Sequence, residues 1–327
     1  MDFIAIGDTV VDEFIKLKEA HVSCDVNHDN CTISMKWGDK IPYDSSVLVP
    51  AVGNAANAAV SAARLGLSTG LISNVGKDRF GEEILAVFKR EGVDTEYIAV
   101  NDGIPTNHHY VLSYEAERTI LIRHEAYPYL IPKELVPPKW VYLSSVGEHT
   151  EAFHNELLEW LRAHRETKLA FQPGTFQIKM GKEKLAGLYA IAEVVAVNKE
   201  EAERILEIGE TGIKELLEKM RALGPKIALI TDGTNGAYTS DGAQVLKVPM
   251  YPDQSPPANR TGAGDAMTST FVAALALGKS LEEALLWGPV NSMSVVRHIG
   301  AQKGLLTRAE LEKLLTSAPA EYRVLPL

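Results

Sequence analysis

The sequence is poor in the features that mark several large classes of protein. Only two of its 327 residues are cysteines, which excludes a small domain held together by several disulfides. There are 33 Lys and Arg against 43 Asp and Glu, a net charge of −10, and no basic cluster, so a nucleic-acid or membrane partner is not expected. No apolar run reaches the length of a membrane span, and the acidic N-terminal stretch is unlike a signal peptide. We therefore expect a cytoplasmic protein.

The two cysteines, Cys24 and Cys31, lie close together in the sequence, with no histidine at the spacing of a zinc site. A disulfide that closes this short loop is one alternative. Two free thiols are the interpretation that we favour, because the cytoplasm is reducing.

Short β-like runs alternate with helical stretches along most of the chain. With 46% hydrophobic and 23% charged residues, the composition is that of a globular protein with a large core. The alternation predicts an α/β fold, a mostly parallel sheet with helices on both faces, in a single domain over residues 1–327. The strand candidates are Phe3–Gly7, Thr69–Val75, Trp140–Ser144, Leu169–Phe171, Val194–Asn198 and Ile227–Thr231, and the helix candidates include Asn54–Leu65, Phe80–Glu91, Glu151–His164 and Lys214–Leu223.

Two segments, about 13–50 and 102–125, break this alternation. The second resembles two strands joined around Glu115–Glu117, which is a hairpin signal. We expect the two segments to form a small separate sheet; two insertions without a role of their own are the alternative. Their basic residues could bind a phosphate on a substrate, although a solvated strand surface is the favoured interpretation. These residues are Lys36, Lys40, Arg118 and Arg123.

The most informative segment is Asn259-Arg260-Thr261-Gly262-Ala263-Gly264-Asp265, which runs into an apolar helical stretch. A helix N-terminus leaves N–H groups unpaired and carries partial positive charge, and glycines let a phosphate approach the backbone. Amides at 262–264 beside an ionised Asp265 suit phosphoryl transfer to an alcohol, because the amides stabilise charge and the carboxylate takes the hydroxyl proton. The alternative is a glycine-rich start of a buried helix, with Asp265 as its cap.

Two common nucleotide-binding motifs are absent. The segment is no dinucleotide fingerprint, because Met267 stands where the third glycine would fall, and the chain contains no Walker A sequence. A nicotinamide dehydrogenase should also show Gly-x-Gly-x-x-Gly after the first strand, and Gly7-Asp8-Thr9-Val10 does not match. We therefore set the dehydrogenase aside.

Asp12 follows the first strand, at the carboxyl edge of the sheet where ligands bind in open α/β folds. A carboxylate there can accept hydrogen bonds from two hydroxyls of a ligand, and Asp8 is a weaker second candidate. Asn57 could offer a donor and an acceptor to the same ligand. A solvated loop acid and an ordinary helix amide are the alternatives. His108 and His109 fall in the expected small sheet, where no partners for a metal site are found.

These motifs together resemble the ribokinase/PfkB family of carbohydrate kinases. The match rests on an ordered set that spans residues 4–301 and not on a single motif. Its members are Gly7 with Asp12, Gly53-Asn54-Ala55-Ala56-Asn57, Val75-Gly76-Lys77-Asp78-Arg79-Phe80-Gly81, Asn198-Lys199-Glu200-Glu201, Thr231-Asp232-Gly233-Thr234-Asn235-Gly236 and Thr261–Asp265.

The resemblance implies a kinase that uses ATP and Mg²⁺ to phosphorylate a sugar, sugar phosphate or nucleoside, with a β-sheet lid through which two subunits pair into a dimer. It implies that Asp265 is the base and that Gly262, Ala263 and Gly264 form the anion hole. The implied acceptor-binding residues are Asp12, Asp8, Gly53, Asn54 and Asn57, the nucleotide-binding ones are Asn198, Thr231, Gly233, Gly236 and Asn291, and Glu201 holds Mg²⁺ through water. Each of these roles has an alternative. Glu201 could simply belong to an acidic helix face, and Gly233 and Gly236 to an ordinary β-turn. Asn291 could lie in a plain buried helix.

Three residues depart from the family pattern. Val52 replaces the first glycine of a Gly-Gly pair, and Asn259 replaces an aspartate tied to a monovalent-cation site, which weakens the expectation of potassium activation. Arg260 has no assigned role. A catalytically silent relative that binds nucleotide or sugar is the alternative function, although the retained Gly-Ala-Gly-Asp and the pair Asn198 and Glu201 argue against it.

Overall fold

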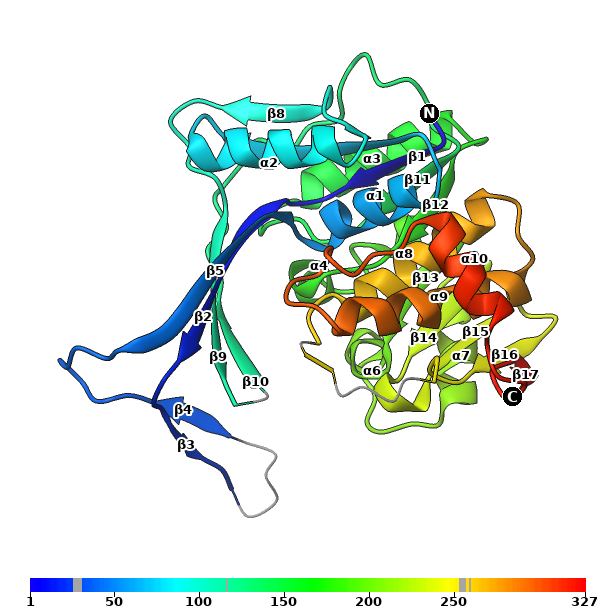
Figure 1. The fold of residues 1–327 in the computed structure, drawn as a ribbon. Coiled ribbons are helices and arrows are strands. Elements are labelled where there is room, and N and C mark those ends of the chain that lie inside the picture. The colour runs from blue at the N-terminus through cyan, green and yellow to red at the C-terminus, as the bar shows by residue number, and fades with distance from the viewer. Residues whose placement is uncertain (26–30, 116, 253–256, 259) are drawn as a thin grey trace.

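The computed structural model describes residues 1–25, 31–115, 117–252, 257–258 and 260–327. Within these residues, a large sheet of eleven strands runs through the molecule in the order β17-β16-β15-β14-β13-β12-β11-β1-β6-β7, with β8 also paired to β6 (Figure 1). The strands are β1 Phe3–Ile6, β6 Thr69–Gly76, β7 Val93–Asp94, β8 Ile98–Asn101, β11 Trp140–Leu143, β12 Lys168–Phe171, β13 Val194–Asn198, β14 Ile227–Thr231, β15 Ala237–Ser240, β16 Val245–Val248 and β17 Leu325–Pro326.

The pairing of the strands is parallel from β7 and β8 through to β14, and antiparallel from β14 to β17. All six strands expected from the sequence belong to the parallel part. The carboxyl ends of these parallel strands meet at one edge of the sheet, which is where open α/β sheets bind ligands.

Both faces of the sheet are covered by helices, as continuous apolar strands require. In β1, Phe3 and Ala5 pack into one core with α1, α8 and α9, while Ile4 and Ile6 pack into the other with α3, α6 and α7. The helices are α1 Asn54–Arg64, α2 Arg79–Arg90, α3 Glu151–Ala163, α4 Thr175–Met180, α5 Ala186–Ile191, α6 Lys199–Leu206, α7 Ile213–Ala222, α8 Ala263–Ala276, α9 Leu281–Val296 and α10 Arg308–Thr316, with a 3₁₀ turn at Gly233–Asn235.

A second, four-stranded sheet projects from the α/β part (Figure 1) and is called the lid below. Its order is β10-β9-β2-β5; β2 pairs in parallel with β9 and antiparallel with β5. Both segments that break the sequence alternation supply its strands, so the expected small sheet is confirmed, although Ala116 of its hairpin lies outside the described residues. The strands are β2 Val10–Leu17, β5 Tyr43–Val52, β9 His108–Tyr114 and β10 Glu117–Leu121.

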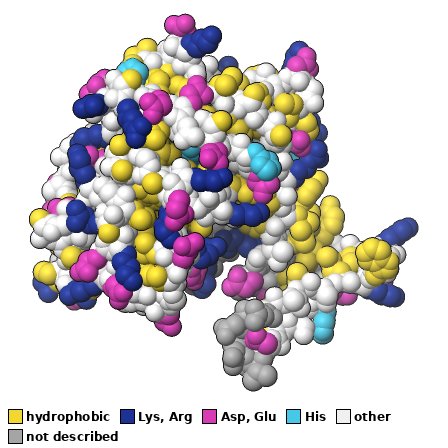
Figure 2. Space-filling model, turned by 180° about the vertical axis from the view of Figure 1, so that it is seen from behind, with side chains coloured by type: hydrophobic (Ala, Val, Ile, Leu, Met, Phe, Trp, Pro, Cys, Tyr) yellow, Lys and Arg dark blue, Asp and Glu magenta, His cyan; other side chains and the backbone are white. Residues whose placement is uncertain are grey.

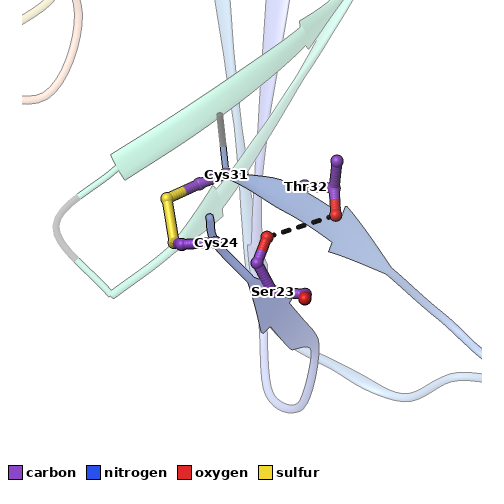
Figure 3. The surroundings of a disulfide bond; sticks show 4 residues. All are labelled: Ser23, Cys24, Cys31 and Thr32. Atoms are coloured by element: carbon purple, nitrogen blue, oxygen red, sulfur yellow. Dashed lines mark hydrogen bonds between the residues drawn. A yellow bond between two sulfur atoms is a disulfide. The ribbon is translucent and has the colours of Figure 1, made fainter. Parts of the chain in front are cut away.

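A short hairpin of β3 (His21–Ser23) and β4 (Thr32–Ser34) extends from the far end of the lid. Ser23 is paired with Thr32, so the next residues outward, Cys24 and Cys31, lie opposite each other and form a disulfide (Figure 3). The expectation of two free thiols was wrong. The sequence spacing showed only a short loop, whereas the antiparallel register brings the two Cα atoms to 4.0 Å.

Among the described helices, none combines the length and the apolar character needed to cross a membrane.

Candidate active site

The N-terminus of α8 is built around a glycine that the packing requires. Gly262 caps the helix in the left-handed region (φ 81°), and a Cβ there would collide with Ala301. Two residues on, Gly264 is exposed and has open space where a side chain would be. The N–H groups of a first helical turn have no partner within the helix. The Ala263 N–H donates to the Arg260 carbonyl oxygen at 3.5 Å, a long hydrogen bond. The turn presents the partial positive charge of the helix N-terminus to an anion.

Asp265 lies in that first turn and is held from two sides. Its Oδ2 accepts a hydrogen bond from Asn57 Nδ2 at 2.8 Å, and its Oδ1 accepts one from Gln172 Nε2 at 3.2 Å. Burial raises the pKa of Asp265, and these two hydrogen bonds act in the opposite direction. The carboxyl group is thus fixed in place with a proton affinity above that of an ordinary aspartate.

The amides of Asn57 and Gln172, which donate to Asp265, each accept a hydrogen bond from another side chain. Asn57 on α1 accepts a hydrogen bond from Gln302 Nε2 at 3.0 Å, and Gln172, which follows β12, accepts one from the Tyr142 hydroxyl. Asn57 is buried, and both ends of its amide are used. The geometry gives Asn57 a positioning role toward Asp265, and the acceptor contact expected from the sequence stays a prediction.

Asp12 lies on β2 at the base of the lid. It is paired in register with His109 on β9, and Asp12 Oδ1 is 3.3 Å from His109 Nδ1. The side chains of His109 and Asp12 are only 13% and 14% exposed. The structure thus places Asp12 between the α/β part and the lid, as an acceptor-binding role requires.

Asp8, directly after β1, already has both carboxylate oxygens engaged. Oδ1 accepts a hydrogen bond from the Tyr129 hydroxyl at 2.7 Å, and Oδ2 lies 2.9 Å from His124 Nδ1. Gly147 N–H donates in turn to the Tyr129 oxygen. Asp8 is 3% exposed, so its geometry is that of a group that positions its neighbours. A substrate contact through Asp8 stays a prediction.

Gly53 brings the start of α1 against this network. It has φ 119°, and a Cβ there would lie 2.6 Å from the Asp8 carbonyl oxygen, so only glycine fits. Asn54, the first residue of α1, is half-buried beside it. The close approach places the Gly53–Asn57 segment, Asp8 and Asp265 in one region.

Asn198 and Glu201 form a reciprocal cap at the start of α6. Asn198 Oδ1 accepts from the Glu201 N–H at 2.8 Å, and Glu201 Oε2 accepts from the Asn198 N–H at 2.9 Å. Burial raises the pKa of Glu201; the hydrogen bond from Asn198 opposes this, and the charge of Asp265 adds to the increase. The negative charges of Glu201 and Asp265 therefore repel each other, and a cation beside them would reduce this repulsion.

No group of three or more side chains that could hold a metal ion occurs in the described parts of the chain. Mg²⁺ is usually held by one or two carboxylates together with water and substrate phosphates. The metal role of Glu201 stays a prediction.

The remaining nucleotide-site candidates lie in two different surroundings. Thr231 ends β14, and Gly233 and Gly236 form the tight turn into β15, closed by the Asp232 N–H to the Gly236 carbonyl at 2.9 Å. Asn291 is fully buried on α9; it donates to Thr270 Oγ1 and accepts from the Leu306 N–H. Both ends of this amide serve the interior, and a nucleotide contact by any of these residues stays a prediction.

Sequence reasoning missed four of the residues that the structure brings to the site. Gln172 could have been found, because it directly follows a predicted strand at the ligand-binding edge. Tyr129, His124 and the pairing of His109 with Asp12 had no local signal.

The fold combines a parallel sheet, covered by helices on both faces, with a lid. A carboxyl group is fixed in the first turn of a helix whose N-terminus can bind an anion. This combination is typical of phosphotransferases that act on an alcohol group. The particular family follows from comparison. The model of the pfkB family of carbohydrate kinases matches residues 29–308, and the chain belongs to this family.

Individual relatives agree with this assignment. The ribokinase of Bacillus subtilis (strain 168) is 28% identical over 288 residues, 86% of this chain and 92% of that protein. The Arabidopsis thaliana ribokinase, solved with ribose and ATP, superposes with a TM-score of 0.80 at 20% identity over 96% of this chain and 98% of its own. An E. coli protein of the ribokinase II type, solved with ATP and Mg²⁺, gives 0.76 at 17% identity, over 97% and 99%. The predicted fold class and family are confirmed, and the protein is a kinase of sugars or nucleosides.

Proposed function

We propose that this kinase transfers the γ-phosphoryl group of ATP to a hydroxyl of a sugar, sugar phosphate or nucleoside, with Mg²⁺ as cofactor. The single observation that carries the proposal is the placement of Asp265. Its carboxyl group lies in the first turn of α8, at the positive end of the helix, and is fixed by Asn57 and Gln172 with a raised pKa. ATP as donor is supported by the two solved relatives that contain it.

Each residue in this proposal has one task. Asp265 accepts the proton of the attacking hydroxyl, which makes the oxygen a better nucleophile. The N–H groups of residues 262–264 stabilise negative charge on the transferring phosphoryl group. Asp12 and the Gly53–Asn57 segment hold the acceptor, and the lid limits access of water, which would otherwise compete as the acceptor. The residues 198, 231, 233, 236 and 291 remain the candidates for nucleotide contacts.

Glu201 is the residue that would hold Mg²⁺, through water. When bound, the ion would neutralise negative charge that develops on the phosphate. A cation there would also reduce the repulsion between Glu201 and Asp265, and so would favour the ionised form of Asp265.

Three further points belong to the proposal. We expect a homodimer formed through the lid and a cytoplasmic location. The aspartate associated with a monovalent cation is replaced by Asn259, which lies outside the described residues, and this weakens the expectation of potassium activation.

A screen of acceptors tests the function. Sugars, sugar phosphates and nucleosides are incubated with the protein, Mg²⁺ and either ATP or ADP, and phosphorylated product is measured by mass spectrometry. We expect transfer from ATP to at least one acceptor, its loss with EDTA and its recovery with Mg²⁺. Binding of sugar or nucleotide without transfer to any acceptor would instead favour the catalytically silent relative.

A further inference from the structure

Two pairs of a carboxylate and an imidazole lie side by side at the base of the lid. Asp12 Oδ1 is 3.3 Å from His109 Nδ1, and Asp8 Oδ2 is 2.9 Å from His124 Nδ1. The two imidazole rings are 5.0 Å apart, so the pairs form one continuous polar wall. Phe176 of α4 packs edge-on against His124 and closes the wall on that side.

The second ring nitrogen of His109 has no partner. His109 Nε2 is buried, and the described residues offer it no hydrogen bond. Buried polar atoms are nearly always satisfied, so an orphaned one indicates a partner that the protein itself does not supply. Nδ1 faces the Asp12 carboxylate, which only accepts hydrogen bonds, so the tautomer with its proton on Nδ1 suits this contact. In that tautomer Nε2 is an acceptor. Asp12 Oδ2 is a second acceptor close by.

This arrangement matches hydroxyl groups. An alcohol donates one hydrogen bond and can therefore satisfy an acceptor such as His109 Nε2 or Asp12 Oδ2, whereas phosphate dianions and carboxylates have no proton to donate. Asp8, with both oxygens already engaged, fixes His124 through one of them and Tyr129 through the other. The wall thus presents fixed acceptors to a polyol.

The basic residues of the lid do not supply the charge that an anionic acceptor needs. All of them are exposed, and three are ion-paired with neighbouring carboxylates: Lys16 with Asp44 at 2.9 Å, Lys36 with Asp39 at 3.6 Å and Arg123 with Glu125 at 2.7 Å, while Lys18, Lys40 and Arg118 complete the set. Arg118 is paired with Ser113, four residues beyond His109 on the same face of β9, which is about 13 Å along the strand. At the wall itself an anion would meet the carboxylates of Asp12 and Asp8.

We propose that the acceptor of this kinase is an uncharged polyol, a free sugar or a nucleoside, whose adjacent hydroxyls are read by Asp12 and His109, and that sugar phosphates are poor acceptors. This inference rests on the proposed function, because it names the acceptor of the same site. His109 and Asp12 are the specificity-determining residues, and Asp8 is a positioning residue that acts through His124.

The first experiment compares kcat/KM for uncharged acceptors with that for their phosphorylated counterparts, one at a time, in the wild-type protein. We expect the best uncharged acceptor to exceed its own phosphate ester by at least about 10-fold. A sugar phosphate preferred over its free sugar, with a preference that Arg118→Ala lowers, overturns the inference and leaves the proposed kinase function intact. Transfer to no acceptor at all is the failure of the proposed function instead.

The second experiment uses His109→Phe, which keeps an aromatic ring of similar size and removes both nitrogens. We expect the KM of the best acceptor to increase about 5- to 20-fold, as for loss of one or two hydrogen bonds, while the KM of ATP changes less than twofold. Deoxy analogues of that acceptor provide the sharper readout. One hydroxyl should matter to the wild type and no longer matter to the variant.

Two controls accompany this variant. His21→Phe on the exposed strand β3 is expected to behave as wild type, and thermal unfolding reports whether His109→Phe is folded. A folded His109→Phe variant that remains as sensitive as wild type to every deoxy analogue contradicts the role of His109. If the variant does not fold, the same analogues are tested on His109→Gln, with the same two outcomes.

Discussion

At the scale of single residues, the site holds its carboxyl group with neutral donors. Asp265 is bound by the amides of Asn57 and Gln172, and within the described residues it has no ion pair. A lysine or arginine partner would favour the ionised form and lower the pKa, whereas amides position the group while burial keeps its pKa raised. The group is therefore oriented without losing its basicity, which suits a general base.

Replacing Asp265 tests this directly. Asp265→Asn keeps the volume and removes the base, so we expect kcat to decrease on the order of 10²- to 10⁴-fold with little change in the KM of ATP. Steady-state kinetics with the best acceptor measures both, and Asp94→Asn on the exposed edge strand β7 is the matched control. Turnover close to wild type in Asp265→Asn would remove this residue from the catalytic role.

The pKa of Asp265 also sets a pH dependence. The proposed base is active when ionised, so we expect activity to fall as the pH drops through the raised pKa of Asp265. The hydrogen bond from Gln172 lowers that pKa, and therefore Gln172→Ala should raise it and move the acid limb of the kcat/KM profile to higher pH. A limb that stays in place or moves to lower pH contradicts this account.

How much of the site could be predicted differs from residue to residue. Asp265, Asp12 and Glu201 could be predicted because each lies next to a local pattern. The pattern is either a glycine-rich helix start or the end of a buried strand, and both can be recognised from a few neighbouring residues. His124 and Tyr129 lie more than a hundred residues from Asp8, and only the packing of the segment before β11 onto β1 brings them together. Such contacts depend on the tertiary fold and leave no periodic pattern.

At the scale of elements, Asp78 joins a helix to the entry of the lid. Its Oδ1 caps α2 through the Gly81 N–H and also accepts from the Thr106 hydroxyl, and its Oδ2 accepts from the Thr106 N–H. The Thr106 hydroxyl in turn accepts from the Gly76 N–H at the end of β6. Burial acts to raise the pKa of Asp78, but these hydrogen bonds outweigh it and lower the pKa. Thr106 precedes β9 by two residues, so this carboxylate anchors a lid strand.

Loss of this anchor should destabilise the protein. Asp78→Ala removes the helix cap and the bonds to Thr106, and we expect the free energy of unfolding to decrease by about 1–3 kcal/mol. Urea denaturation measures the difference, with Asp102→Ala, an exposed surface carboxylate, as the control. Because the pKa is lowered in the folded state, the stabilisation is complete above the unfolded pKa and is lost as the pH falls through the folded one. The difference in free energy of unfolding between Asp78→Ala and wild type should therefore become smaller at acidic pH. A difference that becomes larger would contradict this role of Asp78.

The elements themselves were predictable to different degrees. The six strands expected from apolar runs are buried on both faces, so their sequences carry a strong signal. β2 and β9 are lid strands about ninety residues apart, and their parallel pairing has no counterpart in the local pattern. The same holds for the disulfide of Cys24 and Cys31, which depends on the register of β3 and β4 and not on the spacing of the cysteines.

At the scale of the whole molecule, the lid leaves apolar side chains uncovered. Leu48, Tyr110 and Leu121 are 37%, 42% and 52% exposed. The register pairs Leu48 and Tyr110 with Glu13, and Leu121 with Tyr110, so these side chains share the face of the lid opposite to Asp12. Figure 2 shows hydrophobic side chains gathered along the lid. A second copy of the chain would cover this surface, in keeping with the proposed dimer.

The dimer can be tested at this surface. A charge in the middle of an apolar interface must be desolvated, so Leu121→Asp should convert a dimer to a monomer with the fold retained. Sedimentation velocity measures the mass of both proteins, and Glu117→Gln at the other end of β10 is the control. A wild-type protein that is monomeric at micromolar concentration, or a variant that remains dimeric, excludes the lid as the dimer interface.

The order of the strands in the large sheet also bears on how the protein is made. From β11 to β17, the order along the chain is the order across the sheet, so each strand that leaves the ribosome can pair with the one before it. β1 is the exception, because it lies between β6 and β11 and its second neighbour is not synthesised until Trp140–Leu143. At a synthesis rate of roughly 5–20 residues per second, one edge of β1 therefore stays unpaired for on the order of ten seconds. During that interval the nascent chain exposes one side of a strand that later lies in the interior of its sheet, and a chaperone that covers this side would protect it.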